Sequence, residues 1–143
     1  MKNLSPYIII LISTTLSSNG FADWVKVAKG LEGETFYIDF QKITKKNGYV
    51  FFWNLSDYLK QASCFESDLG QDKHHETLST KVYYKGDCRM LRYKILNYSW
   101  HKKPMGKGIG LSDNLPDKDW THPPYSSSAE TILKTVCKFA TNL

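Results

Sequence analysis

The chain has 143 residues, of which 41% are hydrophobic and 23% are charged, and its net charge is +5. The hydrophobic fraction excludes an intrinsically disordered chain, and the length suffices for one domain rather than two. The positive charge is mild and contains neither a basic run nor zinc-ligand spacing. We therefore exclude a nucleic-acid-binding protein and expect attraction to anionic surfaces such as acidic glycans.

The first 22 residues have the features of a cleavable signal peptide. Lys2 supplies the positive start, the run from Tyr7 to Leu16 is apolar, and Gly20 and Ala22 form a small-x-small cleavage site. A membrane-spanning helix needs about 20 apolar residues, roughly twice this run. We expect an exported protein, in the periplasm, at the cell surface or secreted, with one domain at residues 23–143 and no transmembrane segment. No cysteine lies near the cleavage site, so we expect no lipid anchor.

Three strands are predicted in the first half of this domain. Residues 24–28 and 35–40 alternate between apolar and polar side chains, as strands with one buried face do. Residues 49–58 carry apolar side chains on both faces, which indicates a central strand. The Asn47-Gly48 pair before this strand is the strongest short signal for a β-hairpin.

The second half contains two further strands separated by less regular segments. Residues 61–77 are polar and lack periodicity, which predicts a long surface loop. Strands are expected at residues 78–84 and 91–100, and Gly86-Asp87 between them fits either a turn or a bulge. Residues 102–125 are rich in proline and glycine, so we expect irregular structure there, with a short edge strand at 108–111.

The C-terminal segment predicts an α-helix. Ser127 and Glu130 have the spacing of a capping box at its start. The apolar stripe that follows comprises Ala129, Ile132, Leu133, Val136, Cys137 and Ala140. The whole pattern predicts an α+β fold, in which one C-terminal helix packs on a meandering antiparallel sheet of five to six strands.

The three cysteines are Cys64, Cys88 and Cys137. Cysteines of exported proteins tend to pair, and three allow one disulfide and one leftover thiol. Cys88 lies near a predicted strand and Cys137 on the sheet-facing stripe of the helix, so a bond between them would tie the two layers together. Cys64 lies in the polar segment, where it is either a free thiol or a link between two chains.

No pattern in the sequence predicts catalysis, a metal site or a cofactor. The His74-His75 pair lacks further ligands at zinc spacing, and the three aspartates between residues 113 and 119 lack the glycine and glutamate of a calcium loop. The glycine repeat at residues 106–110 does not lie between a strand and a helix start, as a phosphate-binding loop does. We expect a protein that is not an enzyme.

The aromatic residues outnumber those that a core of this size needs, so some are expected at the surface. Aromatic and basic side chains together suit protein or polyanionic glycan partners. The predicted binding face comprises Lys81, Tyr83, Lys85, Arg92, Lys94 and Tyr98. The alternative is that the tyrosines only cover a sheet packed on both sides.

The sequence resembles the surface-adhesin protein E family of Gram-negative bacteria along nearly the whole domain. The matching segments are Trp24-Val25-Lys26-Val27, Phe36-Tyr37-Ile38-Asp39 with Ile43, Val50 to Trp53 with Leu55 and Asp57-Tyr58, Ser79-Thr80-Lys81, Asp87-Cys88, Met105-Gly106-Lys107-Gly108, Trp120, Pro124 and Val136-Cys137-Lys138.

The resemblance implies an antiparallel sheet backed by a C-terminal helix, and a disulfide between Cys88 and Cys137. It also implies adhesion to host matrix or serum proteins and the ability to form a homodimer. We therefore expect an exported, adhesin-like binding protein. The alternative is a periplasmic structural or accessory protein of the same fold that binds no host molecule.

Overall fold

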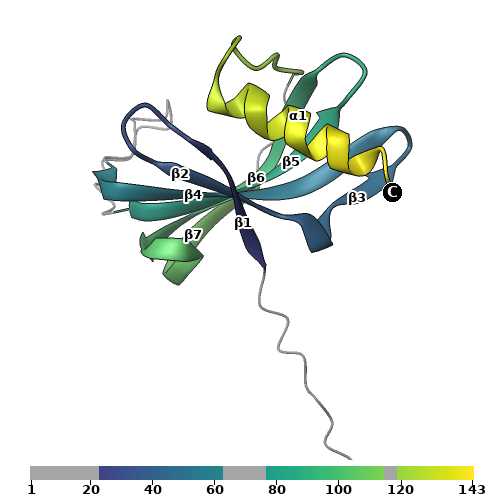
Figure 1. The fold of residues 1–143 in the computed structure, drawn as a ribbon. Coiled ribbons are helices and arrows are strands. Elements are labelled where there is room, and N and C mark those ends of the chain that lie inside the picture. Colours follow the sequence, from purple (N-terminus) through teal and green to yellow (C-terminus); the bar gives the residue numbers. More distant parts are fainter. Residues whose placement is uncertain (1–22, 63–76, 115–118) are drawn as a thin grey trace, which may run out of the picture.

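The computed structural model describes residues 23–62, 77–114 and 119–143. Its strands are β1 (Trp24–Lys29), β2 (Thr35–Asp39), β3 (Thr44–Lys46), β4 (Tyr49–Ala62), β5 (Thr77–Asp87), β6 (Arg92–Lys103) and β7 (Lys107–Asn114). Two short 3-10 helices, η1 (Phe40–Lys42) and η2 (Pro104–Gly106), and one α-helix, α1 (Ser128–Ala140), complete the described elements (Figure 1). The predicted signal peptide, Cys64 and the His74-His75 pair lie outside the described residues.

The strands form one antiparallel sheet in the order β1-β2-β4-β5-β6-β7, and β3 pairs with the start of β4. Asn47 and Gly48 both have positive φ, 53° and 80°, which is the backbone of a type I′ hairpin turn. The predicted α+β fold with a C-terminal helix is therefore confirmed. The expected strand count was low because β3 is short and exposed, with no apolar alternation to mark it.

Three predictions about the chain from residue 61 onward need correction. The edge strand expected at 108–111 extends over Lys107–Asn114, because its backbone pairs with β6 and this pairing needs no apolar alternation. Gly86 and Asp87 are neither a turn nor a bulge but the last residues of β5, and the chain turns at residues 88–91. Residues 61–62 and 77, predicted as loop, belong to strands β4 and β5.

The hydrophobic core lies between α1 and one face of the sheet. Phe52 from β4 and Leu133 from α1 are almost fully buried in it. A Cβ atom on Gly86 would lie 2.9 Å from Leu133 Cδ1, so the glycine allows the helix to approach β5 closely. Ser127 Oγ caps α1 by accepting from the Glu130 backbone N–H, while Glu130 accepts from the Ser126 N–H. The predicted disulfide is present: Cys88 after β5 bonds to Cys137 of α1, with Cα atoms 5.6 Å apart.

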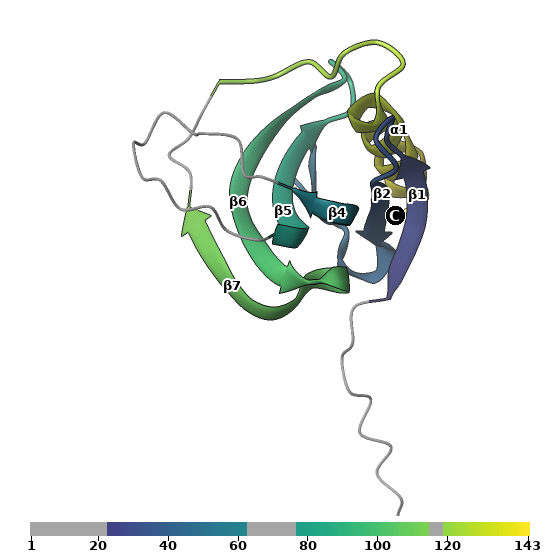
Figure 2. The ribbon, with the colours of Figure 1, turned by 90° about the vertical axis from the view of Figure 1, so that its left-hand side faces the viewer.

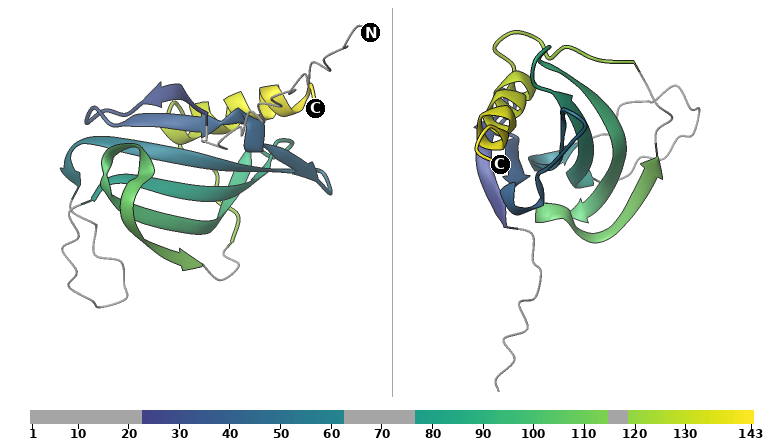
Figure 3. Two further views of the ribbon diagram at one scale, coloured as in Figure 1. Left: turned by 90° about the horizontal axis from the view of Figure 1, so that it is seen from below. Right: turned by 90° about the vertical axis from the view of Figure 1, so that its right-hand side faces the viewer.

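The sheet is strongly curled, and its two faces differ (Figures 2 and 3). We call the face that α1 covers the helix face and the opposite one the inner face. Alternation along β4 directs Val50 and Phe52 to the helix face and Phe51 and Trp53 to the inner face. Helix η2 folds against the inner face, where its Met105 N–H donates to Asp57 Oδ1 at 2.7 Å.

Candidate binding surface

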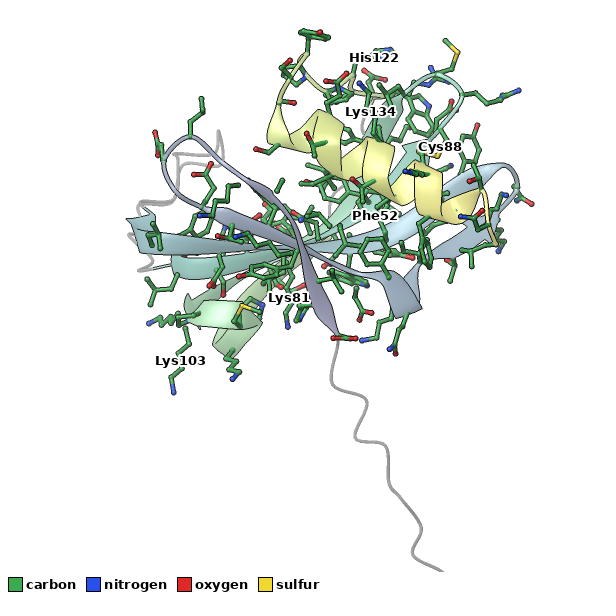
Figure 4. The ribbon with its side chains drawn as sticks, in the orientation of Figure 1. Phe52, Lys81, Cys88, Lys103, His122 and Lys134 are labelled. Carbon is green, nitrogen blue, oxygen red and sulfur yellow. A yellow bond between two sulfur atoms is a disulfide. The ribbon has the colours of Figure 1, made fainter. Side chains whose placement is uncertain are left out.

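The residues of the predicted binding face do not form one patch. On β5, Tyr84 packs with the core on the helix face, so its neighbours Tyr83 and Lys85 point to the inner face. Tyr83 stacks there on Trp53, with ring centroids 4.8 Å apart. Lys81 alternates onto the inner face together with Tyr83 and Lys85, and Figure 4 shows it on the side of the sheet opposite α1. It lines a separate cavity on that face.

Tyr98 lies apart from the other five. Its cross-strand partner on β5 is Val82, which alternates with Tyr83 and therefore belongs to the helix face. The register between β5 and β6 shifts beside Tyr83, so β6 contains one extra residue at this point. This shift places Tyr98 on the opposite face from Lys94, although the two have the same parity in the sequence.

The remaining three predicted residues gather around an aromatic ring that the predicted face did not include. Trp120 stacks on Tyr49, with ring centroids 5.4 Å apart. The distances from the Trp120 ring centroid are 4.7 Å to Arg92 Cζ, 5.4 Å to Lys94 Nζ and 5.6 Å to Lys85 Nζ. Lys85 Nζ also lies 4.3 Å from the Tyr49 ring. We call these five residues the cationic-aromatic cluster.

The main chain holds Trp120 over the sheet. Thr121 forms a two-way backbone bridge with Tyr93 of β6, and both hydrogen bonds are 2.9 Å long. The residue before this bridge is Trp120, which reaches over the starts of β4 and β6 and the end of β5. Residues 119–125 are far from β4 in the sequence, so no local pattern could have assigned this tryptophan to the cluster.

The electrostatics of the cluster favour an anion. Lys85 and Lys94 are direct cross-strand partners, and like charges in such positions repel. Arg92 Nε donates to Asp87 Oδ2 at 3.1 Å. The aromatic rings offset part of the repulsion between the lysines through cation–π contacts, each worth about 0.5–2 kcal/mol. An acidic group bound beside the two lysines and Arg92 would interact favourably with all three cations.

The described part of the chain offers no comparable arrangement for metal chemistry. Within residues 23–62, 77–114 and 119–143, no group of three or more His, Cys, Asp or Glu side chains could hold a metal ion. In the same ranges, no helix is long and apolar enough to cross a membrane.

The glycines of the 106–110 repeat lie in η2 and β7, where Gly106 and Gly108 take positive φ angles.

The sequence of residues 24–138 matches the family described as Surface-adhesin protein E. The chain belongs to this family. No curated protein matches the chain in sequence. Membership of the adhesin E family supports an adhesin-like binding protein that is exported or displayed at the cell surface.

Solved structures of Haemophilus influenzae protein E share the fold. One structure has 13% sequence identity and a TM-score of 0.61, and the match covers 84% of this chain and 87% of that chain. A second crystal form has 14% identity and a TM-score of 0.60, covering 80% and 87%. Protein E from non-typeable Haemophilus influenzae has 13% identity and a TM-score of 0.58, covering 85% and 79%. At this identity the likeness concerns the fold alone.

Proposed function

We propose that this adhesin E family member is an exported, non-enzymatic binding protein whose cationic-aromatic cluster binds an acidic glycan. The observation that carries the proposal is the gathering of Lys85, Arg92 and Lys94 around the Trp120 ring. Ammonium and guanidinium groups bind sulfate and carboxylate groups, and an aromatic ring offers a flat apolar surface to a sugar ring. Acidic patches on host matrix or serum proteins would use the same cations and are the second candidate.

Heparin affinity chromatography tests the proposal. The wild-type protein should be retained at low salt and should elute as salt screens the contacts. Replacing both cross-strand lysines, Lys85→Gln with Lys94→Gln, should lower the salt concentration needed for elution. Trp120→Ala should lower it as well, although it changes no charge, because the ring orders the cations around it.

Lys138→Gln is the control for the loss of one positive charge. Lys138 is exposed on α1, which covers the opposite face of the sheet, so this variant should elute almost like the wild type. Because the double variant removes two charges, a shift for Lys138→Gln of half that size would mean that overall charge, not the cluster, causes retention. The protein could also bind to immobilised matrix proteins. If added heparin does not reduce that binding, the result would favour a protein ligand instead of a glycan.

A further inference from the structure

A second site lies inside the curl of the sheet. A cavity of about 520 Å³ opens there on the inner face, within the range of about 300–1,000 Å³ typical of small-molecule sites. Residues from both edge strands and from the strands between them line it. Six of the lining side chains carry the inference: Trp24, Asp39, Lys42, Trp53, Lys81 and His101.

Asp39 is the most unusual residue of this cavity. It is only 1% exposed, and neither of its carboxylate oxygens accepts a hydrogen bond from the described part of the chain. Its one charged contact there is Lys42 Nζ, 3.3 Å from Oδ2. Asp87 is buried to the same extent but accepts three hydrogen bonds. A buried carboxylate without donors is costly, so a ligand that supplies donors would gain affinity at this position.

His101 supplies a second unused polar atom. Its Nδ1 is buried with no hydrogen-bond partner among the described residues, while its Nε2 lies 2.9 Å from Ser99 Oγ. Burial, assisted by Lys81, lowers the pKa of His101, and a backbone hydrogen bond with Gly108 opposes only part of this shift. Burial, assisted by Lys42, also lowers the pKa of Lys81, which indicates that the two ammonium groups repel each other.

The lining gives the chemical class of the ligand. Two lysines and one aspartate leave one excess positive charge, which a ligand with one negative charge would balance. A simple anion would leave Asp39 without further donors, whereas a neutral sugar or a zwitterion, neither of which has a net charge, would leave the excess positive charge. The indole rings of Trp24 and Trp53 add flat apolar walls, which suit the C–H face of a sugar ring.

We propose that this cavity binds a single sugar acid, whose carboxylate contacts Lys81 and whose hydroxyl groups donate to Asp39. Lys81 lies about 13 Å along β5 from Lys85 at the usual rise of a strand, so the cavity is separate from the cationic-aromatic cluster. The proposal therefore does not depend on glycan binding by that cluster.

Titration calorimetry with D-glucuronate as the probe tests the proposal. The wild type should show saturable binding, and acetate and D-glucose should each bind at least about tenfold more weakly. Asp39→Asn and Lys81→Gln should each weaken glucuronate binding by about tenfold or more, because each removes a charged hydrogen-bonding group. The matched charge control Lys138→Gln should bind like the wild type.

The four tryptophans give an independent readout that needs no variant. In two-dimensional NMR spectra, glucuronate should shift the indole N–H signals of Trp24 and Trp53 and leave that of Trp120 in place. Shifts at Trp120 alone would move the binding to the cluster and overturn the assignment of the cavity. Absence of saturable binding, or acetate binding as strong as that of glucuronate, would also overturn it.

Discussion

Asp87 shows how one buried residue positions the cationic-aromatic cluster. Its Oδ1 accepts from the backbone N–H groups of Arg89 and Met90, at 3.1 and 3.3 Å, and so fixes the turn after β5. Its Oδ2 accepts from Arg92 Nε at 3.1 Å. The carboxylate thus holds the guanidinium that contacts the Trp120 ring. Its role is to position Arg92, since its two carboxylate oxygens already accept these three hydrogen bonds.

Replacing Asp87 with asparagine should destabilise the protein in a pH-dependent way. Burial would raise the pKa of Asp87, but the hydrogen bonds from Met90, Arg92 and Arg89 outweigh it and lower that pKa below its usual value. An aspartate whose pKa is lower in the folded than in the unfolded protein stabilises the fold above about pH 4. This stabilisation is lost as the pH falls through the folded-state pKa. Asp87→Asn should therefore cost about 1–3 kcal/mol at neutral pH, and less in acid.

Thermal unfolding of the wild type and Asp87→Asn between about pH 7 and about pH 2 measures this difference. The gap between the two melting temperatures should narrow below about pH 4, because the wild type loses the charged interactions that the variant already lacks. A gap that stays constant across this range would contradict the role given to the ionised carboxylate.

At the scale of elements, the sequence predicted those whose signals are local. The alternation around Phe52 and the stripe around Leu133 each mark a buried surface within a few residues, and both lie in the observed core. The predicted edge strand at 108–111 covers only half of β7, because the rest of its length depends on backbone pairing with β6. Alternation with a period of two would place Tyr98 and Lys94 on one face, whereas the extra residue of β6 between them places them on opposite faces.

The two candidate sites depend even more on distant parts of the chain. Asp39, Lys81 and His101 belong to three different strands, and only the curl of the sheet brings them to one cavity. Trp120 reaches the cluster through the bridge between Thr121 and Tyr93. Composition indicated an aromatic and basic binding surface, but the grouping of its members required the three-dimensional register.

The disulfide joins helix α1 to the sheet, so its removal should lower the stability of the protein. Cys88 and Cys137 are 49 residues apart in the sequence, and closing such a loop stabilises a protein by about 4 kcal/mol in the chain-entropy model. The double variant Cys88→Ala with Cys137→Ala should lower the melting temperature by on the order of 10 °C.

Thermal unfolding followed by circular dichroism checks this prediction, and a reducing agent should shift the wild type in the same direction. Cys64→Ser is the matched control, because Cys64 is the third cysteine of the sequence and is not part of this bond. The control should melt like the oxidised wild type. A loss of stability in Cys64→Ser as large as in the double variant would contradict the assignment of the stabilising bond.

At the scale of the whole molecule, the sheet separates structural from binding functions. Helix α1, the disulfide and the hydrophobic core occupy the helix face, while both proposed sites lie on the inner face. Substitutions at the proposed sites therefore leave the main core intact, so binding and folding can be tested separately. The inner face is useful to an adhesin only if it is exposed outside the cell.

Treating intact producing cells with external protease distinguishes an adhesin from a periplasmic accessory protein. We expect the surface protein to be cleaved on intact cells, because an adhesin must meet its ligand outside the outer membrane. A known periplasmic protein of the same cells should survive this treatment and be degraded once the outer membrane is permeabilised. If the protein survives and is degraded together with that marker, the adhesin proposal fails, and the cationic-aromatic cluster would have to serve a ligand within the periplasm.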